Sequence, residues 1–207
     1  MMKVRSVILS AAALLAATAP AMADAKTEQF VKQNANEVLN SLNNPSLSAD
    51  ERTALFSDYM EEFADLNAVS KFVIGKYARR FTDEEMKRYQ HAFRTYALAV
   101  YENELDAYRG EEVVVQGSTD RTPRDSIVDT TIERSDGKAM SVRWRVLDRG
   151  GEYQVVDVAL DIDGNLIWLA IEQQAQFLAL LDRTNGSAQA LIDKINGMTA
   201  KLESERR

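Results

Sequence analysis

Residues 65–110 read DLNAVSKFVIGKYARRFTDEEMKRYQHAFRTYALAVYENELDAYRG, and the other predicted elements are arranged around this segment. Thr82 and Glu85 have the spacing of a capping box, which predicts the start of a helix. Apolar residues then recur every three or four positions, and Gly110 is placed to end the helix. Such a helix would be on the order of 40 Å long.

A shorter helix is predicted immediately before it. Asp65 is a residue type that caps helix N-termini, so we expect the helix to begin there. Gly75 interrupts its pattern, and we expect the backbone of a neighbouring element to approach closely at that point. The residues predicted on its inner side are Leu66, Val69, Phe72, Val73 and Tyr77.

The rest of the chain changes its hydrophobic period twice. Amphipathic helices are predicted over residues 26–42 and from the capping box of Ser48 onward. After Gly110 the period becomes two, and after Gly164 the helical period returns over residues 166–181 and 190–198. The predicted strands are residues 111–116, 127–134, 138–147 and 153–161, with a polar turn over residues 118–123. This order predicts an α+β fold, in which a four-stranded antiparallel sheet curls against several helices.

The register of the sheet can be argued from the rule that facing residues share a face. A three-residue loop at 135–137 brings apolar residues opposite one another, whereas a two-residue loop would place them opposite acidic residues. The same argument favours a three-residue loop at 149–151. The predicted pairs are Met140–Ile132, Val142–Thr130 and Trp144–Val128 across the first loop, and Val156–Trp144, Val158–Val142 and Leu160–Met140 across the second.

Residues 1–23 have the features of a cleaved secretory signal. Lys3 and Arg5 precede a short apolar run, and an A-x-A site predicts cleavage before Asp24. The run is too short and too rich in alanine for a stable membrane span, and an uncleaved anchor is the alternative. Residues 24–207 then suit one domain with a sizeable core.

The composition excludes several classes of function. Removing Lys3 and Arg5 with the signal takes the net charge from −7 to −9, which is unlike a nucleic-acid binder. A chain without Cys has no disulfide, no thiolate metal site and no Cys nucleophile. No common nucleotide-binding, hydrolase or zinc-protease motif is present. We therefore predict no cofactor and no enzymatic activity, with an enzyme that uses an α+β pocket as an alternative.

Three features could carry chemistry but are better interpreted as structural. His91 is the only histidine and has no evident nucleophile or metal partner, so we expect it to be solvated. Residues 161–164 resemble part of a calcium loop, but the Glu required further on is replaced by Ala170, which favours a strand-to-helix turn. A basic cluster is either a solvated helix end that pairs with Glu84 and Glu85 or a contact site for an acidic partner or head group. Its members are Lys71, Lys76, Arg79, Arg80, Lys87 and Arg88.

The order of several short motifs resembles the MlaC, or toluene-tolerance, family. These motifs are Ile74-Gly75-Lys76-Tyr77, the Thr82 cap, Phe93-Arg94-Thr95-Tyr96, Asp163-Gly164-Asn165-Leu166, Gln176-Phe177, Gly186 and Leu191-Ile192. The resemblance covers nearly the whole chain after the signal. It depends on the order and spacing of these motifs, because none of them is highly specific on its own. Members of this family are periplasmic phospholipid-binding proteins.

The resemblance implies a monomeric periplasmic phospholipid carrier. Such a protein is the soluble component of a Mla-type ABC transport system that maintains outer-membrane lipid asymmetry. Its implied partners are phospholipid, an inner-membrane MCE-protein ABC transporter complex and an outer-membrane lipoprotein–porin complex. A hopanoid-type lipid carrier and a structural periplasmic adaptor are the alternatives.

The resemblance also implies an internal apolar cavity that holds acyl chains between the sheet and the helices. The predicted lipid-binding residues are apolar or aromatic and lie on inward sides of the predicted elements. They are Phe72, Tyr77, Phe93, Val100, Tyr101, Val128, Met140, Val142, Trp144, Val156, Val158, Ile167, Leu169 and Phe177. In a filled core, the same side chains would pack directly against one another.

Overall fold

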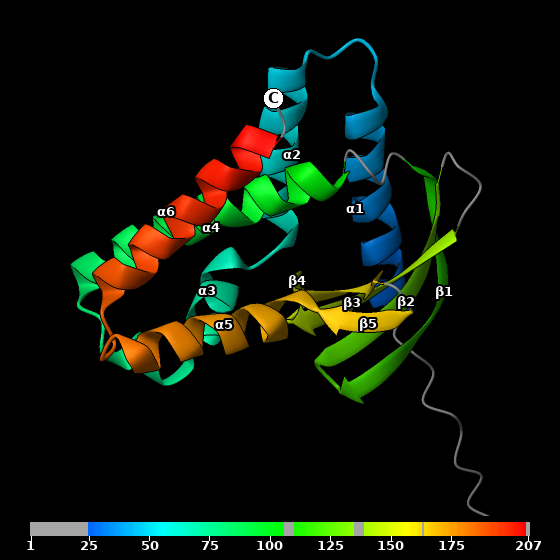
Figure 1. The fold of residues 1–207 in the computed structure, drawn as a ribbon. Coiled ribbons are helices and arrows are strands. Elements are labelled where there is room, and N and C mark those ends of the chain that lie inside the picture. The colour runs from blue at the N-terminus through cyan, green and yellow to red at the C-terminus, as the bar shows by residue number, and fades with distance from the viewer. Residues whose placement is uncertain (1–24, 106–109, 135–138, 163, 206–207) are drawn as a thin grey trace, which may run out of the picture.

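The computed structural model describes residues 25–105, 110–134, 139–162 and 164–205. They form a five-stranded antiparallel sheet with helices packed against it and beside it (Figure 1). The helices are α1 (Ala25–Asn43), α2 (Ala49–Phe63), α3 (Leu66–Ile74), the 3-10 helix η1 (Gly75–Arg79), α4 (Asp83–Leu105), α5 (Leu169–Arg183) and α6 (Ala188–Glu205). The strands are β1 (Gly110–Thr122), β2 (Asp125–Arg134), β3 (Ala139–Asp148), β4 (Tyr153–Ile162) and β5 (Asn165–Trp168), and they are ordered in the sheet as in the sequence. The predicted α+β class is confirmed, with five strands instead of four.

Side-chain caps fix where the N-terminal helices begin. The backbone N–H of Thr82 donates to Oε2 of Glu85 at 2.9 Å, and the backbone N–H of Glu85 donates to Oγ1 of Thr82 at 3.2 Å. Ser48 and Glu51 form the same reciprocal pair before α2. Both predicted capping boxes are therefore confirmed. Helix α4 is described as far as Leu105, and Gly110, which was predicted to end this helix, is the first residue of β1; residues 106–109 between them lie outside the described residues.

Helix α3 begins at the predicted cap and ends at a glycine with an unusual backbone conformation. Oδ1 of Asp65 accepts a hydrogen bond from the N–H of Ala68 at 2.9 Å. Gly75 has a φ of +50°, which residues with a side chain adopt only with strain. A Cβ at this position would lie 3.5 Å from Cδ2 of Leu178, an ordinary contact with a side chain. The predicted close approach of a neighbouring backbone is therefore wrong, and the backbone conformation explains the glycine.

The register between β2 and β3 is the predicted one. The observed pairs include Met140–Ile132, Val142–Thr130 and Trp144–Val128. Residues 135–138 of the connecting loop lie outside the described residues. The pairing places the apolar residues of β3 on one face of the sheet and its two arginines, Arg143 and Arg145, on the other.

Strands β3 and β4 pair differently from the prediction, for two reasons. Asp148 pairs with Tyr153, so residues 149–152 form a four-residue loop instead of the predicted three-residue loop. A β-bulge further along β4 then shifts the register by one more residue, and Trp144 faces Val158. The predicted pairs Val156–Trp144, Val158–Val142 and Leu160–Met140 are therefore wrong. Because of the bulge, Val155 before it and Val158 after it both pack on the apolar face.

Both edge strands also differ from the prediction. β1 continues through the predicted polar turn, where Ser118 pairs with Val128 of β2. β5 occupies the start of the segment that was predicted to be helical, and Ile167 on it pairs with Leu160 of β4. Asp161 and Ile162 are the end of β4 and pair with Leu166 and Asn165 of β5, so the predicted strand-to-helix turn over residues 161–164 is wrong. Asp163 lies outside the described residues.

The apolar side chains gather in two main clusters, one among the helices and one on the sheet. The helical cluster consists of the buried residues Val73, Ile74, Tyr77, Tyr89, Ala92, Phe93, Ala170, Phe177, Leu181, Leu191, Ile192 and Ile195. The sheet cluster consists of the buried residues Ala35, Leu39, Val113, Ile132, Met140, Val142 and Val158. In Figure 1, α4 lies along α6 and α3 lies beside α5, whereas α1 lies against the sheet.

Candidate functional site

Helix α5 connects the two clusters. Leu169 in its first turn packs against the sheet cluster, whereas Phe177 is buried in the helical cluster. Gln173 lies between them on the same side of the helix, because residues four apart share a helix face. This side of α5 marks the boundary where the apolar face of the sheet meets the helices. We take this boundary as the candidate site for an apolar ligand.

Strands β3 and β4 supply the sheet side of the site. Val142 and Val158 are buried there, and Trp144 and Leu160 are half-buried beside them. Nε1 of Trp144 donates to Oγ1 of Thr130 at 2.8 Å, and the Thr130 hydroxyl donates to the carbonyl of Val142 at 3.0 Å. The polar atom of the indole is thus satisfied within the sheet, and its ring contributes apolar surface to the site.

The structure places most of the predicted lipid-binding residues in or beside the two clusters. Tyr77, Phe93 and Phe177 are buried in the helical cluster. Met140, Val142 and Val158 are buried in the sheet cluster, Val128 is buried in a smaller group beside it, and Trp144 and Leu169 pack against these residues. Val100 on α4, Val156 at the bulge and Ile167 on β5 are half-buried. The side chain of Tyr101 lies outside the described residues.

Two of these predicted positions are corrected by the structure. Phe72 is 42% exposed, so the prediction that it lies on the inner side of α3 is wrong. Its side chain follows Lys71 on the solvent side of the helix, while the next two residues, Val73 and Ile74, are buried. Ile167 comes from β5 rather than from the covering helix, because the helix begins only at Leu169.

A buried carboxylate attaches α5 to the sheet. Asp157 on β4 is 7% exposed, and its Oδ1 accepts hydrogen bonds from the backbone N–H groups of Val158 and Ala170, both at 2.9 Å. The second bond reaches the first turn of α5. Burial raises the pKa of Asp157, although the two backbone bonds and the charge of Arg145 oppose this shift. This residue thereby links β4 directly to the start of α5.

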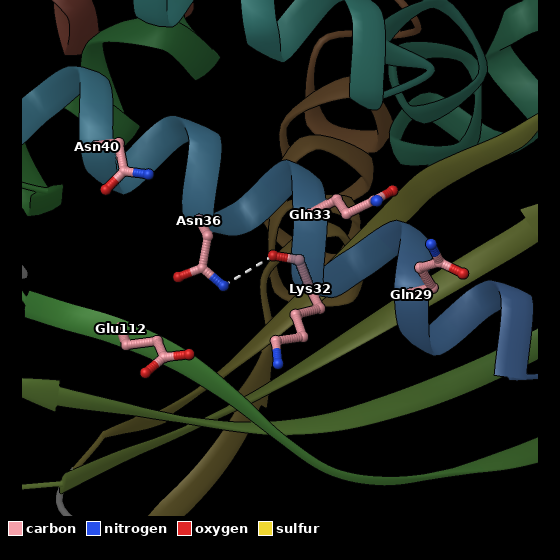
Figure 2. A pocket seen from close by; sticks show the side chains of 6 residues that line it. All are labelled: Gln29, Lys32, Gln33, Asn36, Asn40 and Glu112. Atoms are coloured by element: carbon pink, nitrogen blue, oxygen red, sulfur yellow. Dashed lines mark hydrogen bonds between the residues drawn. The ribbon is translucent and has the colours of Figure 1, made fainter.

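Two hollows in the described part of the chain are lined mainly by polar side chains. The first, of about 600 Å³, lies between α1 and β1 and is lined by Gln29, Lys32, Gln33, Asn36, Asn40 and Glu112 (Figure 2). Nδ2 of Asn36 donates to the carbonyl of Val113 at 3.2 Å, and the N–H of Val113 donates to Oδ1 of Asn36 at 3.0 Å. These two bonds attach α1 to β1. The lining of this hollow does not match the predicted apolar cavity.

The second hollow, of about 370 Å³, lies where α2, α3, α4 and β4 meet. His91 lies at it and is exposed, as predicted, and Arg94 forms an ion pair with Glu61 at the same place. This hollow is also too polar for acyl chains. Among the described residues, no group of three or more His, Asp or Glu side chains is arranged to hold a metal ion.

The basic cluster at the end of α3 and the start of α4 binds the α5–α6 segment. Its bonds are Lys76 to Asp182 at 2.9 Å, Arg80 to the carbonyl of Asn185 at 3.1 Å and Arg88 to Gln189 at 2.6 Å. Glu85, one of the two predicted acidic partners, is instead engaged in the capping box. These three basic side chains therefore link the α3–α4 segment to the α5–α6 segment.

Comparison with known proteins settles the family. The family model described as MlaC protein matches residues 32–197 of the chain. The chain belongs to the MlaC family. The resemblance seen in the sequence motifs is thereby confirmed over most of the chain.

Two relatives of this MlaC chain show how far the similarity extends. The toluene tolerance protein ttg2D of Pseudomonas putida is 25% identical over 140 residues, which cover 67% of this chain and only 63% of that protein. The phospholipid-binding protein from Ralstonia solanacearum, solved in complex with a phospholipid, matches with a TM-score of 0.73 at 20% identity. That match covers 86% of this chain and 98% of the other, and it shows that the two share a fold.

Sequence reasoning did not assign three residues to the site of this MlaC chain. Ala35 and Leu39 of α1 belong to the sheet cluster, and their four-residue spacing is visible in the sequence, but nothing there shows which surface they cover. Gln173 interrupts an apolar helix stripe, which is a visible signal of an inward polar group. In the part of the MlaC chain that the structure describes, no helix combines the length and the apolar character that a membrane crossing requires.

Proposed function

We propose that this protein is a phospholipid carrier that holds acyl chains between the apolar face of the sheet and the helices. The observation that carries the proposal is the fold, which 86% of the chain shares with a protein solved with a bound phospholipid. Membership of the MlaC family supports the same function. A carrier needs no catalytic group, so the proposed function includes no enzymatic activity.

The arrangement of the apolar clusters supports this proposal. Half-buried apolar side chains pack at the borders of both clusters, among them Tyr96 and Ala97 from α4 and Trp144, Leu160 and Leu169 from the sheet and α5. An acyl chain placed between them would complete their burial, which is worth about 0.8 kcal/mol for each methylene group removed from water. In this arrangement the buried members of the predicted set, such as Val142 and Phe177, would support the lining from behind.

The proposed setting is the periplasm. The predicted signal at residues 1–23 supports export, and these residues lie outside the described part of the chain. There the protein would act as the soluble, substrate-binding component of a Mla-type ABC transport system. It would move lipid between an outer-membrane lipoprotein–porin complex and an inner-membrane MCE-protein ABC transporter complex, as a monomer.

Native mass spectrometry of the gently purified protein tests this function. We expect the mass of one diacyl phospholipid above that of the polypeptide, and extraction followed by lipid mass spectrometry would identify it. The same protein after organic extraction is the control, because it must lose the additional mass. Recovery of hopanoids would favour the alternative carrier. A protein that carries no lipid and takes none from phospholipid vesicles would contradict the proposal and favour the adaptor.

A further inference from the structure

The side-chain amide of Gln173 carries a hydrogen-bond donor that the described part of the protein leaves unused. Its Nε2 atom is buried and has no hydrogen-bond partner there. A buried donor without an acceptor destabilises a folded protein, and native structures rarely keep one. An acceptor supplied by a ligand would satisfy it.

The neighbouring glutamines of α5 are different. Nε2 of Gln174 donates to the carbonyl of Phe72 at 2.6 Å, and Nε2 of Gln176 donates to Oε1 of Glu172 at 3.2 Å. Both of these bonds are exposed. The unused donor therefore belongs to the one glutamine that shares its helix face with Leu169 and Phe177.

The position of Gln173 restricts the kind of acceptor. Leu169, one turn before it, packs on the sheet cluster, and Phe177, one turn after it, lies in the helical cluster. An anionic phosphate placed between two apolar clusters would lose its hydration without a countercharge, which is strongly unfavourable. A neutral carbonyl oxygen loses far less. A lipid whose buried part is entirely hydrocarbon would offer no acceptor.

We propose that Gln173 recognises an ester carbonyl of the bound lipid, with its Nε2–H group donating to the carbonyl oxygen where an acyl chain joins glycerol. This inference rests on the proposed phospholipid-carrier function and names its ligand class as ester-linked glycerolipids. Gln173 thereby sets how deep the lipid lies, because the acyl chains extend into the apolar site from a fixed point.

A comparison of ester and ether lipids tests this role. The full-length secreted protein, freed of lipid, is titrated with vesicles of dioleoyl phosphatidylglycerol and with vesicles of the diether analogue, which has the same head group and chains but lacks the carbonyls. We expect the wild-type protein to bind the diester about tenfold more tightly. Gln173→Leu should bind both lipids equally, at about the wild-type affinity for the diether. Gln176→Leu, a change on the exposed side of the same helix, should keep the wild-type preference.

A second measurement separates ligand recognition from a structural role. In the lipid-free state we expect Gln173→Leu to raise the melting temperature, because it removes an unsatisfied buried donor. A lower melting temperature, or failure of this variant to fold, would mean that the amide has a partner within the protein and would overturn the inference.

The outcomes also separate this inference from the function on which it rests. Equal affinity of the wild-type protein for the two lipids, or an unchanged ester preference in Gln173→Leu, overturns the role of Gln173 and leaves the carrier function standing. Failure of the wild-type protein to bind either lipid overturns both.

Discussion

At the scale of single residues, the bond between Trp144 and Thr130 satisfies the one polar atom of a large aromatic side chain in the candidate site. Thr130→Val would leave the indole N–H without this acceptor, and we expect the free energy of unfolding to fall by about 1–3 kcal/mol. Urea denaturation measures the change. Thr131→Val, on the opposite face of the same strand, is the matched control and should change stability by less than about 0.5 kcal/mol. Equal effects of the two substitutions would show that the indole bond is unimportant.

Asp157 should make stability depend on pH in a defined direction. Burial raises its pKa above the ordinary value of 3.8, so the folded state binds the proton more tightly than the unfolded state. The contribution of this group to the free energy of unfolding is therefore largest below pH 3.8 and falls as the pH rises through the folded-state pKa.

Asp157→Asn cannot titrate and isolates this effect. We expect the stability of the wild-type protein relative to this variant to decrease as the pH is raised from below 3.8 and then to become constant, as measured by urea denaturation at a series of pH values. A difference that does not vary with pH would show that burial does not shift the titration of Asp157.

At the scale of secondary-structure elements, the turn between α5 and α6 depends on Gly186. Its φ is +77°, and a Cβ there would lie 2.8 Å from Cε1 of Tyr77 and 2.9 Å from Cζ of Arg80. We expect Gly186→Ala to lower the free energy of unfolding by about 1–3 kcal/mol, because backbone strain and a clash combine. Gly197→Ala is the control, since Gly197 lies in α6 with open space around it and should gain about 1 kcal/mol. Thermal denaturation compares the two, and a Gly186→Ala protein as stable as the wild type would refute the expectation.

The elements that could be predicted from the sequence carry local signals. The capping boxes at Ser48 and Thr82 mark helix starts directly, and the alternation in β3 leaves one acceptable register with β2. β5 has no such signal, because residues 166–171 form one apolar run that suits a strand or a buried helix. The bulge in β4 was missed because Val155 and Val156 are both apolar, so the pattern accepts either of them on the inner face.

The candidate site could be predicted only in part, for a related physical reason. Periodicity shows that Leu169 and Phe177 share a helix face, and the side chains of both pack against apolar clusters in the structure. It does not show that one packs on the sheet and the other among helices, because that depends on contacts between elements distant in the sequence. Likewise, Gln173 is visible as a polar interruption, but only the structure shows that its donor is buried without a partner.

At the scale of the whole molecule, the separation of the two clusters predicts where a charge is tolerated. Val142 is 2% exposed within the sheet cluster, so Val142→Glu buries a carboxylate at a cost of several kcal/mol, against a typical total stability of about 5–15 kcal/mol. We expect that variant not to fold. Leu169 is half-buried at the border of the cluster, and Leu169→Glu should fold but lose bound lipid. Circular dichroism and lipid mass spectrometry measure the two properties, and a folded Leu169→Glu protein with normal lipid content would exclude this border as the lipid site.

The contact of Asn36 with β1 has a consequence for strand pairing between copies of this chain. β1 is an edge strand, and the unpaired N–H and C=O groups of an edge can template a strand from another chain. The amide of Asn36 occupies both of these groups at Val113, and Glu28 of α1 binds Ser118 further along the same strand. The opposite edge, β5, offers only four residues. By these contacts α1 covers part of the β1 edge, and we expect the sheet to resist pairing with strands of other copies at high local concentration.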